Sequence, residues 1–152
     1  MSTVPIHTDH DEISAEEFDL LQQKVLDARN LSYSPYSKFR VGCTLMTESG
    51  EYISGANLEN AAYGACICAE RTALSKALLE GHRKLKLIAI SSDSEEPITP
   101  CGICRQFIRE FGPSVPVYMF GTKGKFQKVY LQDLLPLSFG PENLGIDPEH
   151  YK

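Results

Sequence analysis

No block or stripe of basic residues occurs in this chain, and basic residues are fewer than acidic ones. The sequence has 15 Lys and Arg against 20 Asp and Glu, a formal net charge of −5 with neutral histidines. A protein that binds a nucleic-acid backbone needs a basic patch to neutralise the phosphates. We therefore expect no nucleic-acid partner.

Long apolar runs are also missing. No stretch approaches the roughly 20 apolar residues that a membrane-spanning helix needs, and residues 1–17 are polar and acidic, unlike a signal or transit peptide. The five cysteines are an odd number, which does not fit the paired disulfides of a small secreted protein. We expect a soluble protein of the reducing cytoplasm, with no membrane partner.

The length of 152 residues is that of one ordinary domain. Such a chain buries about 70% of its extended-chain surface, so it can build a core without disulfides. We divide it into a flexible N-terminal arm (residues 1–13), a single folded domain (14–144) and a C-terminal tail (145–152).

Apolar periodicity and turn residues predict alternating helices and strands. A helix begins at Ser14, where Glu17 completes a capping box, and Ser32–Ser37 ends it. Three further helices are predicted over Cys68–Glu80, Cys101–Phe111 and Leu131–Leu135. Five strands are predicted over Phe39–Met46, Glu51–Gly55, Leu85–Ser91, Val115–Phe120 and Phe126–Tyr130. This order implies an α/β fold with a mixed sheet layered with helices.

Three cysteines and one glutamate form a spaced motif, Cys68-Ala-Glu70 followed by Cys101-Gly-Ile-Cys104. The cysteines fall at predicted helix starts, where free N–H groups and the helix dipole favour thiolates. Three protein ligands leave one position of a tetrahedral Zn²⁺ open, and a catalytic water occupies such a position. Glu70 can carry protons for that water. The motif is typical of zinc deaminases and predicts an enzyme that removes an amino group by hydrolysis.

Two other interpretations of these cysteines stay open. Cys101 and Cys104 could form a thioredoxin-like redox pair, although the usual βαβ context is absent and Glu70 would have no role. Alternatively, Cys66 could join the three cysteines in a closed structural site, because four thiolates leave no position for water.

An arginine directly after the first motif bears on its charge. Three thiolates on Zn²⁺ carry a net charge of −1, which weakens the metal as a Lewis acid. Arg71, and also Arg105, could donate hydrogen bonds to ligand sulfurs and offset that charge.

Several stretches resemble one known family. They are Tyr33-Ser-Pro-Tyr-Ser-Lys-Phe-Arg-Val-Gly42, Gly55-Ala-Asn-Leu-Glu-Asn60, Cys68-Ala-Glu-Arg71, Pro100-Cys-Gly-Ile-Cys-Arg-Gln106, Leu134-Leu-Pro136 and Phe139-Gly-Pro141. In this order and spacing, from about Leu20 to Leu144, the sequence resembles the small, homotetrameric, zinc-dependent cytidine deaminases.

The resemblance implies an α/β/α three-layer sandwich around a mixed five-stranded sheet, with residues 14–144 as the catalytic domain. It implies a homotetramer with active sites at subunit interfaces, and one Zn²⁺ per subunit. The implied reaction is the deamination of cytidine and deoxycytidine in pyrimidine salvage.

The resemblance also assigns individual residues. It implies Cys68, Cys101 and Cys104 as zinc ligands, Glu70 as the proton shuttle and Arg71 as a donor to ligand sulfur. The implied substrate-binding residues are Phe39, Asn57, Glu59, Asn60, Ala61, Tyr63, Ala69 and, from a neighbouring subunit, Phe139. Asn57 and Glu59 match residues that hold the ribose 3′-hydroxyl, and Phe39 matches an aromatic that packs on the pyrimidine.

Other functions remain to be separated from this one. A structural zinc module would keep its metal without catalysis. A polynucleotide deaminase should carry a basic surface, which the net charge of −5 does not suggest. A deaminase of another small aminopyrimidine compound is the nearest rival.

Overall fold

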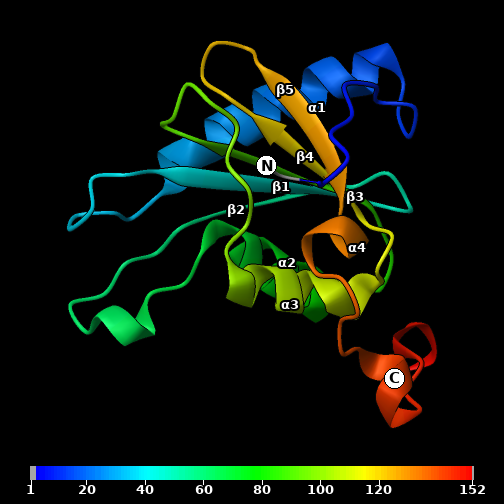
Figure 1. Ribbon diagram of the computed structural model, residues 1–152. Coiled ribbons are helices and arrows are strands. Elements are labelled where there is room, and N and C mark those ends of the chain that lie inside the picture. Colours follow the sequence, from blue (N-terminus) through cyan, green and yellow to red (C-terminus); the bar gives the residue numbers. More distant parts are fainter. Residues whose placement is uncertain (1–2, 152) are drawn as a thin grey trace.

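Five strands form one mixed sheet in the computed structural model, which describes residues 3–151 (Figure 1). The strands are β1 (Val41–Thr47), β2 (Tyr52–Ala56), β3 (Leu85–Ser92), β4 (Pro116–Phe120) and β5 (Phe126–Tyr130). Their order is β2-β1-β3-β4-β5, with β3 and β4 parallel and the other neighbouring pairs antiparallel. The predicted mixed five-stranded sheet is confirmed.

Helices cover both faces of this sheet. They are α1 (Ala15–Ala28), α2 (Ala69–Leu79), α3 (Gly102–Ile108) and the short α4 (Leu131–Leu134). Single 3₁₀ turns occur at Arg29–Leu31, Tyr63–Ala65, Arg109–Phe111, Pro141–Leu144 and Pro148–His150. Helix α1 lies on one face, and α2, α3 and α4 lie on the other (Figure 1). This is the predicted α/β/α sandwich. Within residues 3–151, no helix is long and apolar enough to cross a membrane.

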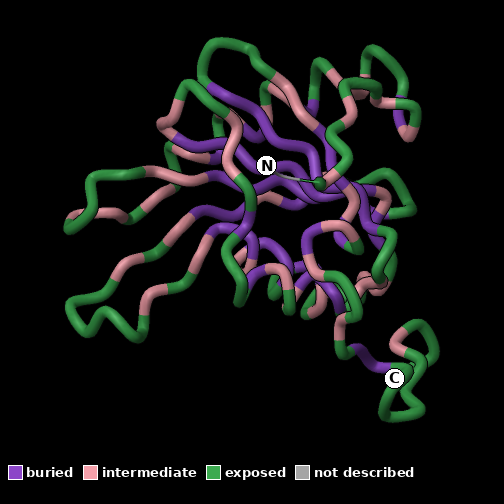
Figure 2. Tube along the Cα trace, in the orientation of Figure 1, coloured by how far each residue is buried: buried purple, intermediate pink, exposed green. Residues whose placement is uncertain are grey.

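The strands supply two apolar layers because successive side chains point to opposite faces. On β3, Leu87 and Ala89 pack on the side of α1, whereas Ile88 and Ile90 pack on the side of α2. Figure 2 shows the buried residues concentrated in the sheet and in the helix faces that contact it. The loop between β2 and α2 and the C-terminal end are mostly exposed and project from this core (Figure 2).

Helix α1 begins as the sequence predicts. The Ser14 hydroxyl accepts a hydrogen bond from the Glu17 N–H at 3.1 Å, and the Glu17 carboxylate accepts from the Ser14 N–H at 3.0 Å. Its apolar face buries Leu21, Val25 and Ala28 against the sheet. Both the capping box and the helical spacing are therefore confirmed.

The N-terminal arm, predicted to be flexible, pairs with the edge strand β5 at His7. His7 and Lys128 exchange two backbone hydrogen bonds of 2.8 Å each. The buried Lys128 ammonium pairs with the carboxylates of Asp9 and Glu12. The His7 bridge therefore pairs the backbone N–H and C=O groups of Lys128 on the outer edge of β5, which an edge strand otherwise leaves free.

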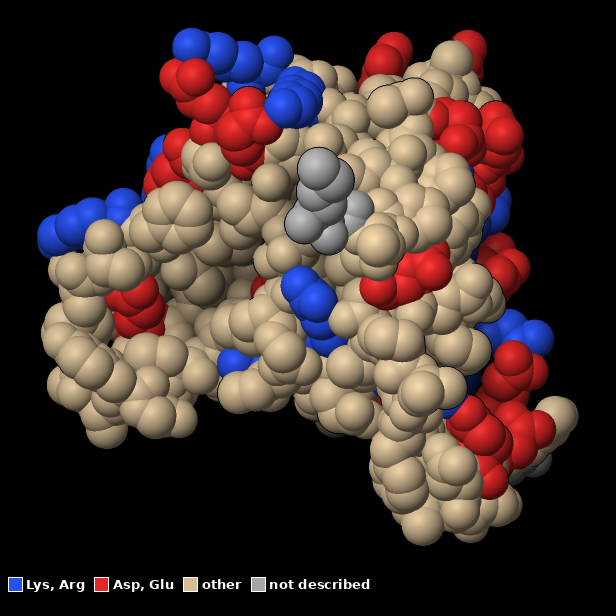
Figure 3. All heavy atoms as spheres, viewed as in Figure 1, with Lys and Arg blue, Asp and Glu red and all other residues tan. Residues whose placement is uncertain are grey.

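Charges are distributed in small groups on the surface. On the face shown in Figure 3, basic and acidic side chains are interspersed, and no broad basic patch is visible. This agrees with the small negative net charge of the chain.

Glycine at position 55 lets α2 approach β2. A Cβ atom at Gly55 would lie 2.6 Å from the backbone N of Ala73 and 3.1 Å from the carbonyl O of Ala69. Both atoms are backbone, so neither can move without shifting the helix. The position of α2, and of its first turn, therefore depends on this close contact.

We predict that Gly55→Ala lowers the free energy of unfolding by about 1–3 kcal/mol, because the added methyl overpacks the contact between strand and helix. Gly64→Ala is the control, since a Cβ there meets nothing within 4 Å. Urea unfolding at one fixed protein concentration measures both. Equal stability of the two variants would contradict the close contact.

Candidate active site

Two helices on the same face of the sheet begin at cysteines. Cys68 is the N-cap of α2 and Cys101 is the N-cap of α3, and both have extended backbone conformations. The first N–H groups of a helix have no partner within it, and the dipole makes this end positive. The meeting of two such ends favours thiolates there.

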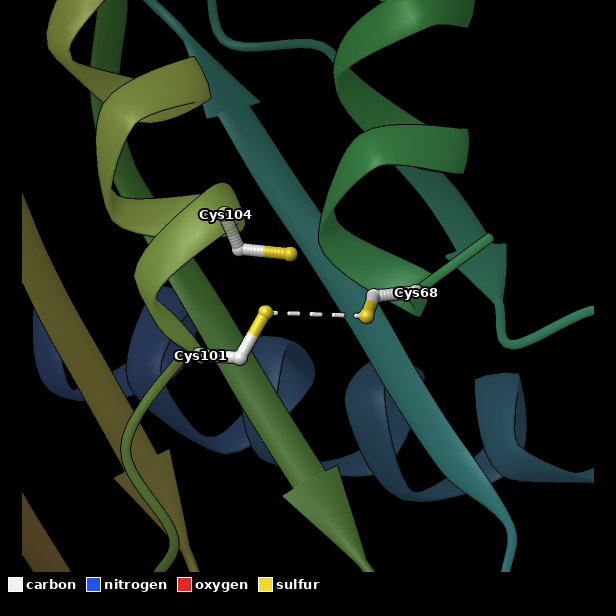
Figure 4. A group of neighbouring side chains, drawn as sticks. All are labelled: Cys68, Cys101 and Cys104. Carbon is white, nitrogen blue, oxygen red and sulfur yellow. Dashed lines mark hydrogen bonds between the residues drawn. The ribbon is translucent and has the colours of Figure 1, made fainter. Parts of the chain in front are cut away.

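Three cysteine sulfurs converge between these helix ends (Figure 4). The Sγ atoms of Cys68 and Cys101 lie 3.8 Å apart, and those of Cys68, Cys101 and Cys104 all lie within 4.8 Å of one another. Zn–S bonds of about 2.3 Å at tetrahedral angles require sulfurs about 3.8 Å apart. The donor set therefore fits Zn²⁺. In the part of the chain that the structure describes, it is the one such group of metal-binding side chains.

The side chain of Cys66 makes hydrogen bonds outside the group of three cysteines. Its sulfur accepts a hydrogen bond from the backbone N–H of Asn60 at 3.3 Å and donates to the Asn60 carbonyl at 3.8 Å. It is not in the group of three converging sulfurs. The geometry therefore favours an open site with three cysteines over a closed site with four.

Arg71 supplies positive charge to the sulfurs. Its Nη2 donates to Cys68 Sγ at 3.4 Å. A hydrogen bond from Cys104, together with that from Arg71, lowers the pKa of the Cys68 thiol to about 5. The Cys68 thiolate and burial in turn raise the pKa of Cys104. Cys68 is thus a thiolate at neutral pH, the form that binds metal, and metal binding would displace the proton of Cys104.

Glu70 lies beside the sulfurs in the first turn of α2. Its side chain is only 4% exposed, and its Oε2 accepts a hydrogen bond from Cys104 Sγ at 3.6 Å. Burial, with the nearby Cys68 thiolate, raises the pKa of this carboxyl. A carboxyl that holds its proton more readily than usual is suited to both accept and return protons.

A family model of the cytidine and deoxycytidylate deaminase zinc-binding region matches residues 16–120. The chain belongs to this family. It is 43% identical to a cytidine deaminase of Halalkalibacterium halodurans, over 83% of this chain and 96% of that protein. It is 46% identical to a cytidine deaminase of Sporosarcina psychrophila, over 80% of this chain and 90% of that protein.

A solved structure agrees with this assignment. The crystal structure of cytidine deaminase from Burkholderia pseudomallei is similar with a TM-score of 0.77 and 40% identity, over 84% of this chain and 100% of that chain. Family membership and the donor set together identify the cofactor of this deaminase as Zn²⁺.

Two side chains predicted to bind the sugar lie in the loop after β2. The Asn57 amide already holds this loop to its neighbours: Oδ1 accepts from Ser32 Oγ at 2.6 Å and from the Val41 N–H at 2.9 Å. Its Nδ2 donates one hydrogen to the Phe39 carbonyl at 2.9 Å. One amide hydrogen is therefore left for a ligand.

Glu59 is held by the segment before β1. Its Oε1 accepts hydrogen bonds from the backbone N–H groups of Tyr36 and Ser37, at 3.0 Å each. Hydrogen bonding from the Ser37 side chain and backbone lowers the pKa of Glu59, which keeps it negative at neutral pH. Ser32, Tyr36 and Ser37 were not singled out from the sequence, although they lie in or beside the first stretch that resembles the family.

A pocket of about 320 Å³ opens beside this loop. It is large enough for part of a small polar ligand. Its lining residues are Tyr36, Ser37, Glu59, Tyr63 and Cys66. The structure therefore brings two of the predicted substrate-binding residues, Glu59 and Tyr63, to one pocket.

The remaining predicted residues lie in different surroundings. Asn60 and Ala61 are exposed on the loop, Phe39 is 39% exposed, and Phe139 is 58% exposed near the C-terminal end. Ala69, the first residue of α2, is fully buried in the core. Their roles in binding stay predictions.

We predict one Zn²⁺ per chain in the purified protein, measured by plasma mass spectrometry. Cys101→Ser should lose it or bind it far more weakly, by more than the 10–100-fold that a change next to a ligand costs. Cys66→Ser is the matched control and should keep full zinc occupancy. Loss of zinc from the Cys66 variant would instead support the closed site with four cysteines.

Proposed function

We propose that this chain is a cytidine deaminase that converts cytidine and deoxycytidine to uridine and deoxyuridine, with one Zn²⁺ per subunit. The observation that carries the proposal is the buried Glu70 in contact with Cys104, one of three sulfurs spaced for a tetrahedral metal. The relatives named above act on cytidine according to their names.

The proposed chemistry exchanges an amino group for an oxygen. Cys68, Cys101 and Cys104 would hold Zn²⁺, which would act as a Lewis acid and lower the pKa of a bound water toward about 7. Glu70 accepts a proton from the water as its oxygen bonds to C4 of the pyrimidine, and passes this proton to N3. Glu70 then takes the proton of the new hydroxyl and delivers it to the amino group. The C4–N bond breaks, ammonia leaves and the 4-oxo product remains.

The residues of the loop after β2 are proposed to bind the nucleoside. The free amide hydrogen of Asn57 and the second carboxylate oxygen of Glu59 are suited to sugar hydroxyls. Phe39 packs on the base, while Asn60, Ala61, Tyr63 and Ala69 contribute to the same site. The negative charge of Glu59 would repel a phosphate, which favours nucleosides over nucleotides.

The proposed assembly is a homotetramer with active sites between subunits. Two observations support subunit contacts in this region. Phe139 and Tyr63 expose large apolar side chains on segments that project from the core. An apolar groove of about 600 Å³ also runs between α2 and α3, where Leu78, Ile103 and Phe107 line it. Phe139 would enter the site of a neighbouring subunit.

We also propose a role in pyrimidine salvage in the cytoplasm. Its reducing conditions would keep the five cysteines as thiols, which zinc binding requires. Competition between cytidine and other aminopyrimidine nucleosides in one assay would separate this substrate from its nearest rivals.

Glu70→Gln should keep zinc and nucleoside binding but lower kcat for cytidine by at least about 10²–10⁴-fold, because the amide cannot carry protons. Ammonia release measures the turnover. Glu80→Gln, an exposed glutamate at the C-terminal end of the same helix, is the control and should turn over cytidine normally. Turnover close to that of the unmodified chain in Glu70→Gln would reject the assignment.

Glu59→Gln should raise KM for cytidine about tenfold, because a charged hydrogen bond to the sugar becomes a neutral one. The Gln carbonyl still accepts from Tyr36 and Ser37, so the loop should keep its shape. The ratio of kcat/KM for cytidine 5′-phosphate over cytidine should increase in this variant. Glu48→Gln, in the turn between β1 and β2, serves as the control for loss of a surface charge. An unchanged KM in Glu59→Gln would exclude contact with the sugar.

A further inference from the structure

A buried arginine at the end of α3 has no part in the chemistry proposed above. Arg109 is only 4% exposed, and the hydrogen-bond partners of its guanidinium lie in one segment near the C-terminus. Its Nε donates to Ser138 Oγ at 2.7 Å, and its Nη2 pairs with the carboxylate of Glu142. We call residues Ser138–Glu142 the C-terminal segment. The buried guanidinium ties this segment to α3.

The C-terminal segment lies directly against the guanidinium. A Cβ atom at Gly140 would be 2.4 Å from Cζ of Arg109 and 2.5 Å from each of its terminal nitrogens. The φ of Gly140 is −146°, which any residue adopts. Close contact with Arg109, and not backbone conformation, therefore disfavours a side chain here, because either the buried guanidinium or the segment would have to move.

Two more contacts hold the same segment. The Gln106 amide, one turn before Arg109 on α3, donates to the Phe139 carbonyl at 3.0 Å. The Gly140 N–H donates to Asn143 Oδ1 at 2.8 Å, and the Gly140 carbonyl accepts from the Asn143 N–H at 3.0 Å. The backbone on both sides of the Phe139 side chain is thus held in one conformation.

This well-held segment presents an apolar side chain outward, because Phe139 is 58% exposed. Leu137, just before the segment, is fully exposed with a left-handed φ of 55°. Leucine rarely adopts that conformation. A buried arginine that holds the segment carrying an exposed phenylalanine makes physical sense where the partner of that side chain lies outside the chain.

We propose that Arg109 is a positioning residue that holds Phe139 in the active site of a neighbouring subunit. This inference rests on the proposed function and the proposed homotetramer. Helix α3 then serves two active sites: its first turn supplies Cys101 and Cys104 to its own metal, and its end holds the segment that reaches the neighbour.

Two variants should displace the segment while leaving the core and the metal ligands unchanged. Gly140→Ala pushes the segment off the guanidinium, and Arg109→Gln removes the guanidinium. Each should raise KM for cytidine by roughly 5- to 100-fold, the range expected for a lost stacking contact between an aromatic side chain and a base. The kcat should change much less, and zinc content should stay at one per chain.

The matched control is Lys84→Gln. Lys84 pairs with Glu149 at 2.9 Å, so this variant also removes a cationic contact to the C-terminal end, but one beyond the C-terminal segment. Its KM should stay at the value of the unmodified chain.

Mixed assemblies test whether the segment acts between subunits. Gly140→Ala chains have an active site but a displaced segment, whereas Glu70→Gln chains have an inactive site and an intact segment. Two different tags allow assemblies that contain both chains to be purified after they are refolded together. In these assemblies the active sites of Gly140→Ala chains should regain a KM close to that of the unmodified enzyme, because a Glu70→Gln neighbour supplies Phe139.

Three results would overturn the inference. They are an unchanged KM in both variants, a loss of kcat and zinc without a change in KM, and a raised KM that mixing does not reverse. The last result would mean that the segment acts within its own chain.

Turnover of cytidine by the unmodified chain is measured first. Its absence would reject the proposed function together with this inference, whereas normal turnover with an unchanged KM in the variants rejects the inference alone.

Discussion

The metal site depends on two helices that begin close together on one face of the sheet. Each starts at a cysteine, so the positive ends of α2 and α3 and their unpaired N–H groups surround the sulfurs. This convergence requires α2 to lie close to β2, and Gly55 permits the contact because a Cβ there would meet the helix backbone at 2.6 Å. The position of Cys68 in the metal site thus depends on the close packing of α2 against β2.

Charge at this site is balanced among a few side chains. The Cys68 thiolate and the Glu70 carboxyl lie in a partly buried region, and Arg71 lies against Cys68, where its positive charge offsets that of the thiolate. Burial raises the pKa of the Glu70 carboxyl, since desolvation disfavours its charged form, and the nearby Cys68 thiolate adds to this shift.

Two exposed segments extend from this rigid centre, and each is held by specific side-chain contacts. The loop after β2 is tied to the start of β1 through Asn57 and Glu59. The segment around Phe139 is tied to α3 through Gln106 and Arg109. An exposed segment that is held this firmly can bind with little loss of conformational entropy. Such pre-organisation suits segments that complete a binding site.

The sequence by itself determined the α/β alternation, the capped start of α1 and the Cys68, Glu70, Cys101 and Cys104 motif. These follow from local spacing, since side-chain periodicity and capping depend on residues only a few positions apart. Only the tertiary structure decided three other features. Asn57 hydrogen-bonds to Ser32 and Val41, Cys66 lies outside the sulfur cluster, and Arg109 contacts Gly140. The contacts of Asn57 and Arg109 join segments between 16 and 31 positions apart, and no periodic pattern records which distant side chains the packed sheet and helices bring together.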